Sequence, residues 1–356
     1  MERHLRNLLL TVAVGALLAG CHHSDAGNAN TAAVSGKDAA PAGFTIKKVP
    51  LPGEGRGDYI TVDAKGGRLY VTHSAAVHIL DLATLKPLGT VTGLKAAHGI
   101  AIDEASGHAF VTDGDSNAVV MFDPATGKRL KTIAAGKKPD AILRDPASGM
   151  ILAFDGDSDE VSVIDPASGS VRQTIRLPNG PEFPQADGKG KVWVNLEEGD
   201  SIAEINTNAM KLARTIPLTG CDGPAPLAFD AANRVLFSGC GNKVMAVTDA
   251  DSGKVLTTVP IGTDPDGIVF DPATKRIFVA NREGGWTIVD QKGRSDYAVE
   301  QTLKIDEYAK TAALDPDTHR VFTSTADLIW PQATPGKKLL PNARSGTFRL
   351  LVVSQN

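Results

Sequence analysis

The chain is built from short runs in which apolar and polar residues alternate. The stretch 267–290 contains three such runs, "GIVFD", "RIFVAN" and "WTIVD", which are separated by polar turns. Alternation with a period of two is typical of β-strands that have one buried face. Asp-Pro-Ala-Thr and Asp-Pro-Ala-Ser stand between runs, where Asp and Pro favour tight turns. The pattern predicts an all-β fold with almost no helix.

The group of strands itself repeats along the chain. An aspartate closes the first predicted strand of each repeat: Asp63, Asp103, Asp145, Asp187, Asp230, Asp271 and Asp315. Successive aspartates are 40, 42, 42, 43, 41 and 44 residues apart. A period of about 42 residues with four short strands is typical of β-propeller blades. One such unit cannot bury both faces of its sheet, so neighbouring units are expected to stack.

The last repeat lacks a fourth strand. It begins at Lys310, and its third predicted strand, "FRLLVVSQ", ends the chain. The segment "FTIKKVPLP" at 44–52 precedes the first repeat and has the pattern of the other fourth strands. Pairing the two segments would close the ring and remove its exposed edges. The sequence therefore predicts one domain over 44–356, a seven-bladed β-propeller with four-stranded antiparallel blades, in which the N-terminal strand completes the last blade.

Three segments carry a resemblance to a known family. "LYVTHS" (69–74), "AFVTDGDS" (109–116) and "IFVANREG" (277–284) resemble the repeat of the YVTN-type, YncE-like propellers. The resemblance covers the chain from about Phe44 to its end and implies the WD40-like propeller architecture. It offers no catalytic motif to carry over, because propellers support unrelated activities.

The first residues have the features of an export signal. Arg3 and Arg6 form a basic start, residues 8–18 form an apolar stretch, and small residues follow. The apolar stretch is too short to cross a bilayer. We therefore expect this segment to direct export rather than to form part of the fold.

The end of that segment, "LAGC", resembles the lipobox of bacterial lipoproteins. The resemblance implies a signal peptide at 1–20, lipidation of Cys21 and a flexible tether at 21–43, which is small and polar. His22 stands where an inner-membrane protein would carry Asp. The expected location is thus the bacterial cell envelope, facing the periplasm at the outer membrane and touching it through the lipid alone. An ordinary secreted protein cut near this point is the alternative.

The net charge of the chain indicates which classes of partner to expect. The chain has 37 Lys and Arg against 41 Asp and Glu, a formal charge of −4. Without residues 1–20, 35 basic and 40 acidic residues remain, and the charge is about −5. A general nucleic-acid-binding protein would show a basic face, so nucleic acid is not an expected partner. An envelope protein or a small molecule is expected instead.

The residues that open the innermost strands are candidates for a binding site. In a propeller these residues surround one mouth of the central channel. Counting five residues back from each repeat aspartate gives Asp58, His98, Asp140, Glu182, Ala225, Asp266 and Lys310. Several carboxylates at one mouth predict binding of a divalent cation such as calcium, or of a small cationic or hydroxylated ligand. Alternatively, these side chains are polar only because the channel is wet and the preceding loops need caps.

Three functions fit these positions. The first is a binding or scaffold module whose ligand is held at the mouth. The second resembles the propeller lactonases: a metal-assisted lactone or ester hydrolase with Asp58, Asp140, Glu182 and Asp266 as ligands and His98 as proton carrier. The third is a non-catalytic relative of quinoprotein amine dehydrogenases. The sequence has no Ser-His-Asp spacing, phosphate loop or paired-cysteine redox motif that would favour an enzyme.

The loop at 326–346 in the seventh repeat is much longer than its equivalents in the second and third. Long loops in compact domains are usually functional or disordered. This loop places Trp330 near Lys337 and Lys338, an apolar anchor with basic neighbours, and exposed tryptophan is frequent at interfaces. It is predicted to be a lid or a partner-docking segment that shares the mouth with Tyr308. The alternative is a loop that packs its own aromatic residue against the rim.

Cys221 and Cys240 are predicted to form a disulfide. Cys221 precedes the first strand of the fifth repeat and Cys240 ends the second, so antiparallel pairing brings them together at one face. Export favours oxidation. A thiol pair for soft metals or redox exchange, and two separate thiols, are the alternatives.

Overall fold

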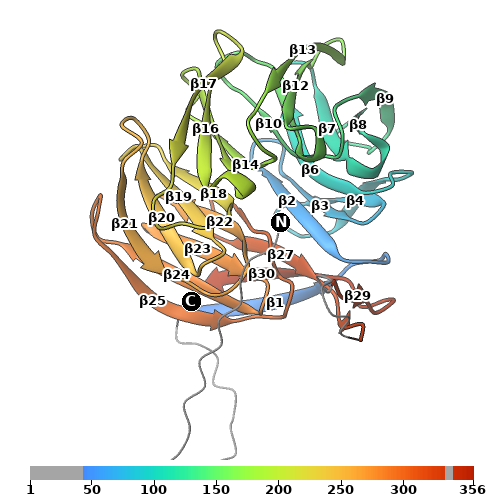
Figure 1. Cartoon of the computed structure of the whole chain (residues 1–356). Helices are drawn as coiled ribbons and strands as arrows, with labels where there is room; N and C mark the ends of the chain where they lie inside the picture. Colours follow the sequence, from blue (N-terminus) through green and yellow to red (C-terminus); the bar gives the residue numbers. More distant parts are fainter. Residues whose placement is uncertain (1–42, 333–339) are drawn as a thin grey trace, which may run out of the picture. The chain divides into compact units, whose positions relative to one another are not determined.

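A computed structural model describes residues 43–332 and 340–356. Within these ranges it contains seven four-stranded antiparallel sheets arranged in a ring, and one two-stranded ribbon. Figure 1 shows the sheets following one another around a central axis in chain order. The fold is the predicted seven-bladed β-propeller. The signal peptide at 1–20, Cys21 and the tether up to residue 42 lie outside the described residues.

Each of the first six blades consists of four strands that follow one another in sequence. Blade one comprises β2 (Gly57–Asp63), β3 (Arg68–His73), β4 (Ala76–Asp81) and β5 (Pro87–Val91). Blade two comprises β6 (Ala97–Asp103), β7 (His108–Asp113), β8 (Ala118–Phe122) and β9 (Arg129–Ala134). Blade three comprises β10 (Pro139–Arg144), β11 (Ile151–Asp155), β12 (Glu160–Asp165) and β13 (Ser170–Arg176).

The next three blades have the same order. Blade four comprises β14 (Pro181–Ala186), β15 (Lys191–Leu196), β16 (Ser201–Asn206) and β17 (Lys211–Pro217). Blade five comprises β18 (Pro224–Asp230), β19 (Val235–Cys240), β20 (Val244–Asp249) and β21 (Val255–Pro260). Blade six comprises β22 (Pro265–Asp271), β23 (Arg276–Asn281), β24 (Gly285–Gln291) and β25 (Tyr297–Lys304).

Blade seven joins the two ends of the propeller chain. It comprises β26 (Ala313–Leu314), β27 (Val321–Thr325), β30 (Arg349–Gln355) and β1 (Phe44–Pro50), with β1 outermost. Phe44 pairs with Gln355 and Pro50 with Arg349, so β1 is antiparallel to β30 over its whole length. This is the predicted closure. It gives the C-terminal strand a partner and leaves no open edge inside the ring.

The core lies between blades rather than within them. Seven clusters of buried apolar side chains occur among the described residues, one at each interface between neighbouring blades. Trp193 belongs to the cluster between blades four and five, and Trp286 to that between blades six and seven; both are fully buried. Both tryptophans therefore pack between blades. Each sheet is stable only because both of its faces are covered by neighbours.

The repeat aspartates have a structural role. Each of the seven accepts a backbone N–H from the turn that follows its strand, for example Asp63 from Gly66 at 2.7 Å and Asp145 from Ser148 at 2.9 Å. A carboxylate in this position takes the place of a backbone acceptor and stabilises the tight turn. The recurrence of Asp therefore reflects turn formation, and the chemistry of the protein lies elsewhere.

Three single 3₁₀ turns and one ribbon complete the described structure. The turns η1 (Gly114–Ser116), η2 (Gly156–Ser158) and η3 (Glu197–Gly199) join the second and third strands of blades two, three and four. In blade seven the equivalent loop contains the ribbon β28 (Leu328–Ile329) and β29 (Asn342–Ala343). None of the described helical segments could traverse a bilayer.

Candidate functional site

In each of the first six blades, the pairing register shifts near the start of the first strand. In β2, Gly57 pairs with His73, but the next paired residue is Ile60, which faces Val71. The same kind of shift occurs near the start of β6, β10, β14, β18 and β22. A bulge of this kind turns side chains away from the regular alternation. In each of these six strands it contains the second residue, which is the predicted site position.

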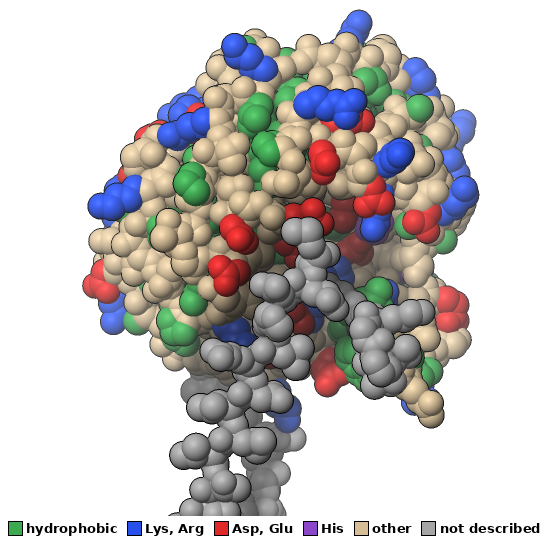
Figure 2. Space-filling model, viewed as in Figure 1, with side chains coloured by type: hydrophobic (Ala, Val, Ile, Leu, Met, Phe, Trp, Pro, Cys, Tyr) green, Lys and Arg blue, Asp and Glu red, His purple; other side chains and the backbone are tan. Residues whose placement is uncertain are grey.

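The bulged residues line one cavity of about 690 Å³ at the mouth of the channel. All seven predicted positions contribute to it: Asp58, His98, Asp140, Glu182, Ala225, Asp266 and Lys310. Loops on the same face complete the wall, including Asp115 in η1 and Glu197 in η3. Figure 2 shows acidic side chains around the centre of this face. The sequence therefore identified the residues that meet at the mouth.

Two aromatic rings from different blades stack in the wall of the cavity. Tyr59 of β2 and Phe183 of β14 are stacked with centroids 4.9 Å apart and an interplanar angle of 28°. Both line the cavity, and they come from blades one and four. Offset stacking of this kind is favourable. The pair gives a polar cavity an aromatic surface next to its carboxylates.

A chain of alternating charges runs along one side of the mouth. Asp58 contacts His98 Nδ1 at 2.5 Å through one oxygen and Lys310 Nζ at 2.8 Å through the other. Lys310 also contacts Asp266 at 2.9 Å, and Asp266 contacts Arg282 at 3.0 Å. These side chains are mostly buried, so each charge depends on its partners for the stabilisation that water would otherwise supply.

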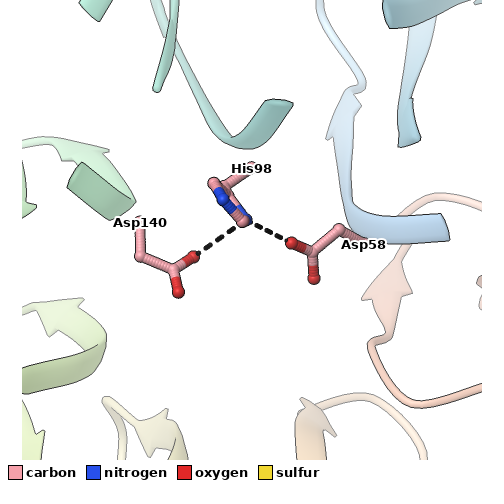
Figure 3. A group of neighbouring side chains, drawn as sticks. All are labelled: Asp58, His98 and Asp140. Carbon is pink, nitrogen blue, oxygen red and sulfur yellow. Dashed lines mark hydrogen bonds and ion pairs between the residues drawn. The ribbon is translucent and has the colours of Figure 1, made fainter. Parts of the chain in front are cut away.

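His98 lies between two carboxylates. Figure 3 shows the imidazole between Asp58 and Asp140, which approach from different blades. The Asp140 carboxylate is 3.5 Å from His98 Nδ1. One ligand atom from each of these three residues lies within 4.8 Å of the others, which is compatible with holding a metal ion.

The predicted ligand set of four carboxylates is not assembled. Among the described residues, only Asp58, His98 and Asp140 form a group of metal-ligand spacing. The ammonium of Lys310 lies between Asp58 and Asp266 and neutralises both. His98, expected to carry protons beside a metal, instead occupies the space between two of the proposed ligands. Lys310 was predicted to line the mouth, but its role as a counter-ion follows only from the tertiary structure.

The alternating chain keeps Asp58 and His98 ionised. Burial alone would raise the pKa of Asp58, but the charge of Lys310 and the hydrogen bond from His98 lower it well below its usual range. Burial alone would lower the pKa of His98, but the hydrogen bond to Asp58 and the charge of Asp140 raise it to about 9. His98 is therefore a cation at neutral pH, and it can donate a proton more readily than accept one.

On the other side of the mouth from Lys310, burial raises the pKa values of carboxyl groups. Burial raises the pKa of Glu182 to about 8, and the nearby charges of Asp140 and Glu197 act in the same direction. Glu182 has no hydrogen-bond or ion-pair partner among the residues that the structure describes. Burial also raises the pKa of Asp140, although the charge of His98 partly offsets the effect. Glu182 and Glu197 thus line this part of the wall without an ion pair to any described cation, whereas Asp140 contacts His98.

The long loop of blade seven reaches the rim. Trp330, directly after β28, is half exposed, donates from Nε1 to Glu307 at 3.4 Å and lies edge-on to Tyr308 with centroids 6.0 Å apart. Tyr308 and Leu340 line the cavity. Lys337 and Lys338, the basic part of the predicted docking segment, lie outside the described residues. The aromatic part of the loop thus packs against the rim while leaving half of Trp330 exposed.

The structure joins Cys221 and Cys240 in a disulfide, with Cα atoms 5.3 Å apart. The bond links the loop before β18 to the end of β19. Other blades make the same link by hydrogen bonds: Asp113 ends β7 and accepts two backbone N–H groups from the loop before β6, and Thr325 ends β27 and donates to Glu307 O. These links hold the loops that enter the mouth.

Several residues that line the cavity escaped prediction from the sequence, among them Arg56, Tyr59, Phe183, Glu197 and Arg282. Tyr59 and Phe183 directly follow predicted site positions, and strict alternation would have turned them away from the channel. The bulges bring them in. Arg282 directly follows the "IFVAN" strand, so its position in the repeat could have predicted that it lies on the mouth face.

Comparisons with known proteins identify the fold alone. No family model matches the chain, and no curated protein matches it either. Among many solved structures that match, hydrazine synthase of Kuenenia stuttgartiensis aligns with a TM-score of 0.67 and 15% sequence identity, over 82% of this chain and 96% of that one. At this identity the likeness supports a propeller fold and carries no function.

Proposed function

We propose that this protein is a binding module that takes up a small molecule at the mouth of its channel. The observation that carries the proposal is the cavity of about 690 Å³, which is lined by side chains from all seven blades and includes charges already held in a fixed network. Its size is within the range of cavities that hold small ligands. Because the polar side chains are already held in place, the protein would lose little conformational entropy when a ligand binds.

Binding is favoured over catalysis by the state of His98. Its Nδ1 is hydrogen-bonded to Asp58 at 2.5 Å and lies 3.5 Å from the Asp140 carboxylate. A general base needs to be neutral at the working pH. With a pKa of about 9, His98 is protonated at neutral pH and acts as an internal counter-ion.

The proposed setting is the bacterial cell envelope. The lipobox-like "LAGC" supports lipidation of Cys21, and His22 supports the outer membrane with the propeller facing the periplasm. Membership of the YncE-like family, supported by the three repeat segments, is part of the same proposal. A small molecule in this compartment is the proposed ligand. Trp330, with Lys337 and Lys338, is proposed to dock an envelope protein.

The binding proposal is tested by filling the mouth. Ala225 lines the cavity without taking part in the ion network, so Ala225→Trp should occupy space while leaving the charges in place. Thermal unfolding is measured with a panel of small amines, carboxylates and sugars at millimolar concentration. We expect at least one compound to stabilise the wild-type protein, by about 2.7 kcal/mol at 100 times its Kd, and to lose this effect in the variant.

The matched control adds the same indole elsewhere. Leu130 lies in β9 and is 44% exposed, so Leu130→Trp should keep the response of the wild-type protein. Stabilisation that persists in Ala225→Trp would place the ligand outside the mouth. A panel without any stabilising compound would argue against a small-molecule site.

A metal-assisted hydrolase is the second candidate, favoured by the spacing of Asp58, His98 and Asp140. One imidazole and two carboxylates resemble a zinc ligand set with an open position more than a calcium site, which takes six to eight oxygens. Calorimetric titration of the metal-free protein with Zn²⁺ should show one ion bound, with affinity lost in Asp140→Asn and kept in Asp157→Asn, an exposed acid outside this group. Ester hydrolysis should then depend on Zn²⁺. Absence of Zn²⁺ binding would exclude this candidate.

A further inference from the structure

The three cations of the ion network at the mouth are all paired with acidic side chains. His98 contacts Asp58 and Asp140, Lys310 contacts Asp58 and Asp266, and Arg282 contacts Asp266. Three positive and three negative groups thus balance along blades three, two, one, seven and six. A charged ligand that approached this side would have to break existing ion pairs, so this side does not supply the main charge for recognition.

The remaining acids lie at blade four. Glu182, the second residue of β14, and Glu197, the first residue of η3, both line the cavity and find no cationic partner among the described side chains. The next position around the ring is Ala225, which adds no charge and leaves room beside Glu182. This corner of the cavity is therefore acidic, and the Glu182 carboxyl is mostly ionised above its pKa of about 8. Arg56 and Lys138 also line the cavity, but neither forms an ion pair with Glu182 or Glu197, so a cationic ligand can supply the missing partner.

An aromatic surface adjoins the same corner. Phe183 follows Glu182 in β14, lines the cavity and stacks on Tyr59. Aromatic faces attract organic cations and also pack against alkyl chains. They provide no ligand atoms for a metal ion, and the two carboxyl groups would repel an anion. The combination favours a cation that carries an apolar body.

We propose that the ligand of this cavity is an organic ammonium compound, with its nitrogen held by Glu182 and its alkyl or aryl body resting on Tyr59 and Phe183. This inference rests on the proposed function and names the chemical class of the ligand. The ammonium N–H groups would donate to the Glu182 carboxylate, and Glu197 at the rim would attract the cation as it enters. The ion pairs of the opposite wall would remain intact.

The test compares three probes of similar shape: n-butylamine, 1-butanol and butyrate. Binding is measured by calorimetry at pH 8.5, where the amine is a cation and the Glu182 carboxyl is mostly ionised. We expect n-butylammonium to bind and the alcohol and carboxylate to bind at least about 10-fold more weakly, because only the ammonium forms a charge-assisted hydrogen bond. Equal binding of n-butylammonium and 1-butanol would overturn the proposal.

Two variants test whether Glu182 supplies the negative charge that holds the ammonium group. Glu182→Gln keeps the shape of the side chain and should weaken n-butylammonium binding by about 10- to 100-fold. Glu198→Gln removes the same charge from the exposed neighbour of Glu197, which does not line the cavity, and should leave affinity within about 2-fold because exposed charges are screened. Equal losses in the two variants would show a general field effect and reject the site. Circular dichroism confirms that both variants are folded.

The results distinguish failure of the ammonium proposal from failure of the proposed binding function. If no amine binds but another compound stabilises the wild-type protein and not Ala225→Trp, the mouth binds a ligand and the ammonium assignment is wrong. If n-butylammonium binds wild type and Ala225→Trp equally, the amine site lies outside the mouth and both proposals fail. Weaker binding to Ala225→Trp together with weaker binding to Glu182→Gln supports both.

Discussion

The Lys310→Met variant is expected to lose about 3–5 kcal/mol of stability toward unfolding. Lys310 has an exposed side-chain fraction of 17% and contacts both Asp58 and Asp266, which are 16% and 10% exposed. Methionine keeps the length of the side chain but removes the charge, so two mostly buried carboxylates lose their shared counter-ion. The loss is measured by urea unfolding at pH 7.

Two comparisons make this result specific. Lys138→Met removes an exposed ammonium whose nearest carboxylate, Asp157, is 4.0 Å away, and it should cost less than about 1 kcal/mol. Adding Asp58→Asn to Lys310→Met should restore much of the stability, because His98 can then pair with Asp140 and Arg282 with Asp266, and the charges balance again. A cost for Lys310→Met no larger than that for Lys138→Met would show that the ion network does not form as described.

The Asp155→Asn variant is expected to be more stable than the wild-type protein at pH 8. Asp155 ends β11 and is fully buried. Ser162 donates to its Oδ2 at 2.7 Å, whereas its Oδ1 is buried without a hydrogen-bond partner. Burial raises the pKa of Asp155 to about 7, although the hydrogen bond from Ser162 opposes the rise. An amide has no charge to bury.

The direction of the pH dependence follows from linkage. The folded pKa of Asp155 lies above the value of 3.8 for a free aspartate, so its contribution to stability is fully present below pH 3.8. It is lost as the pH rises through 7, because the unfolded chain ionises first. The loss is about 4 kcal/mol, from 1.36 kcal/mol per unit of pKa difference. The advantage of Asp155→Asn should approach this value at pH 8 and nearly vanish at pH 4.

Asp113 provides a matched control for this prediction. It has the equivalent place at the end of β7, but it accepts the backbone N–H groups of Lys95 and Ala96, both at 2.9 Å. Asp113→Asn should therefore destabilise the protein by about 1–3 kcal/mol, because charge-assisted hydrogen bonds are lost. Urea unfolding of both variants between pH 4 and pH 8 measures the two effects. If Asp155→Asn also destabilises at pH 8, Asp155 makes a favourable contact in its ionised form.

The fold could be predicted from the sequence because the patterns that indicate its turns and strands are local and repeated. Turn-forming aspartates such as Asp63 and Asp145 mark the end of the first strand in every blade, and alternation marks the strands between them. The unpaired segment at 44–52 and the missing fourth strand of blade seven indicated how the ring closes. Counting back from the aspartates then located Asp58, His98 and their equivalents, since a repeated blade places equivalent residues at equivalent points around an axis.

Which residues gather at the mouth follows from the sequence alone, because repetition converts position in a blade into position around the ring. How those residues interact depends on the three-dimensional arrangement of the blades. The bulges that bring Tyr59 and Phe183 into the channel, and the pairing of Lys310 with both Asp58 and Asp266, depend on side chains from different blades. Whether a carboxyl group meets a cation, as at Asp58, or none, as at Glu182, depends on distances of a few ångströms between blades that are far apart in the chain.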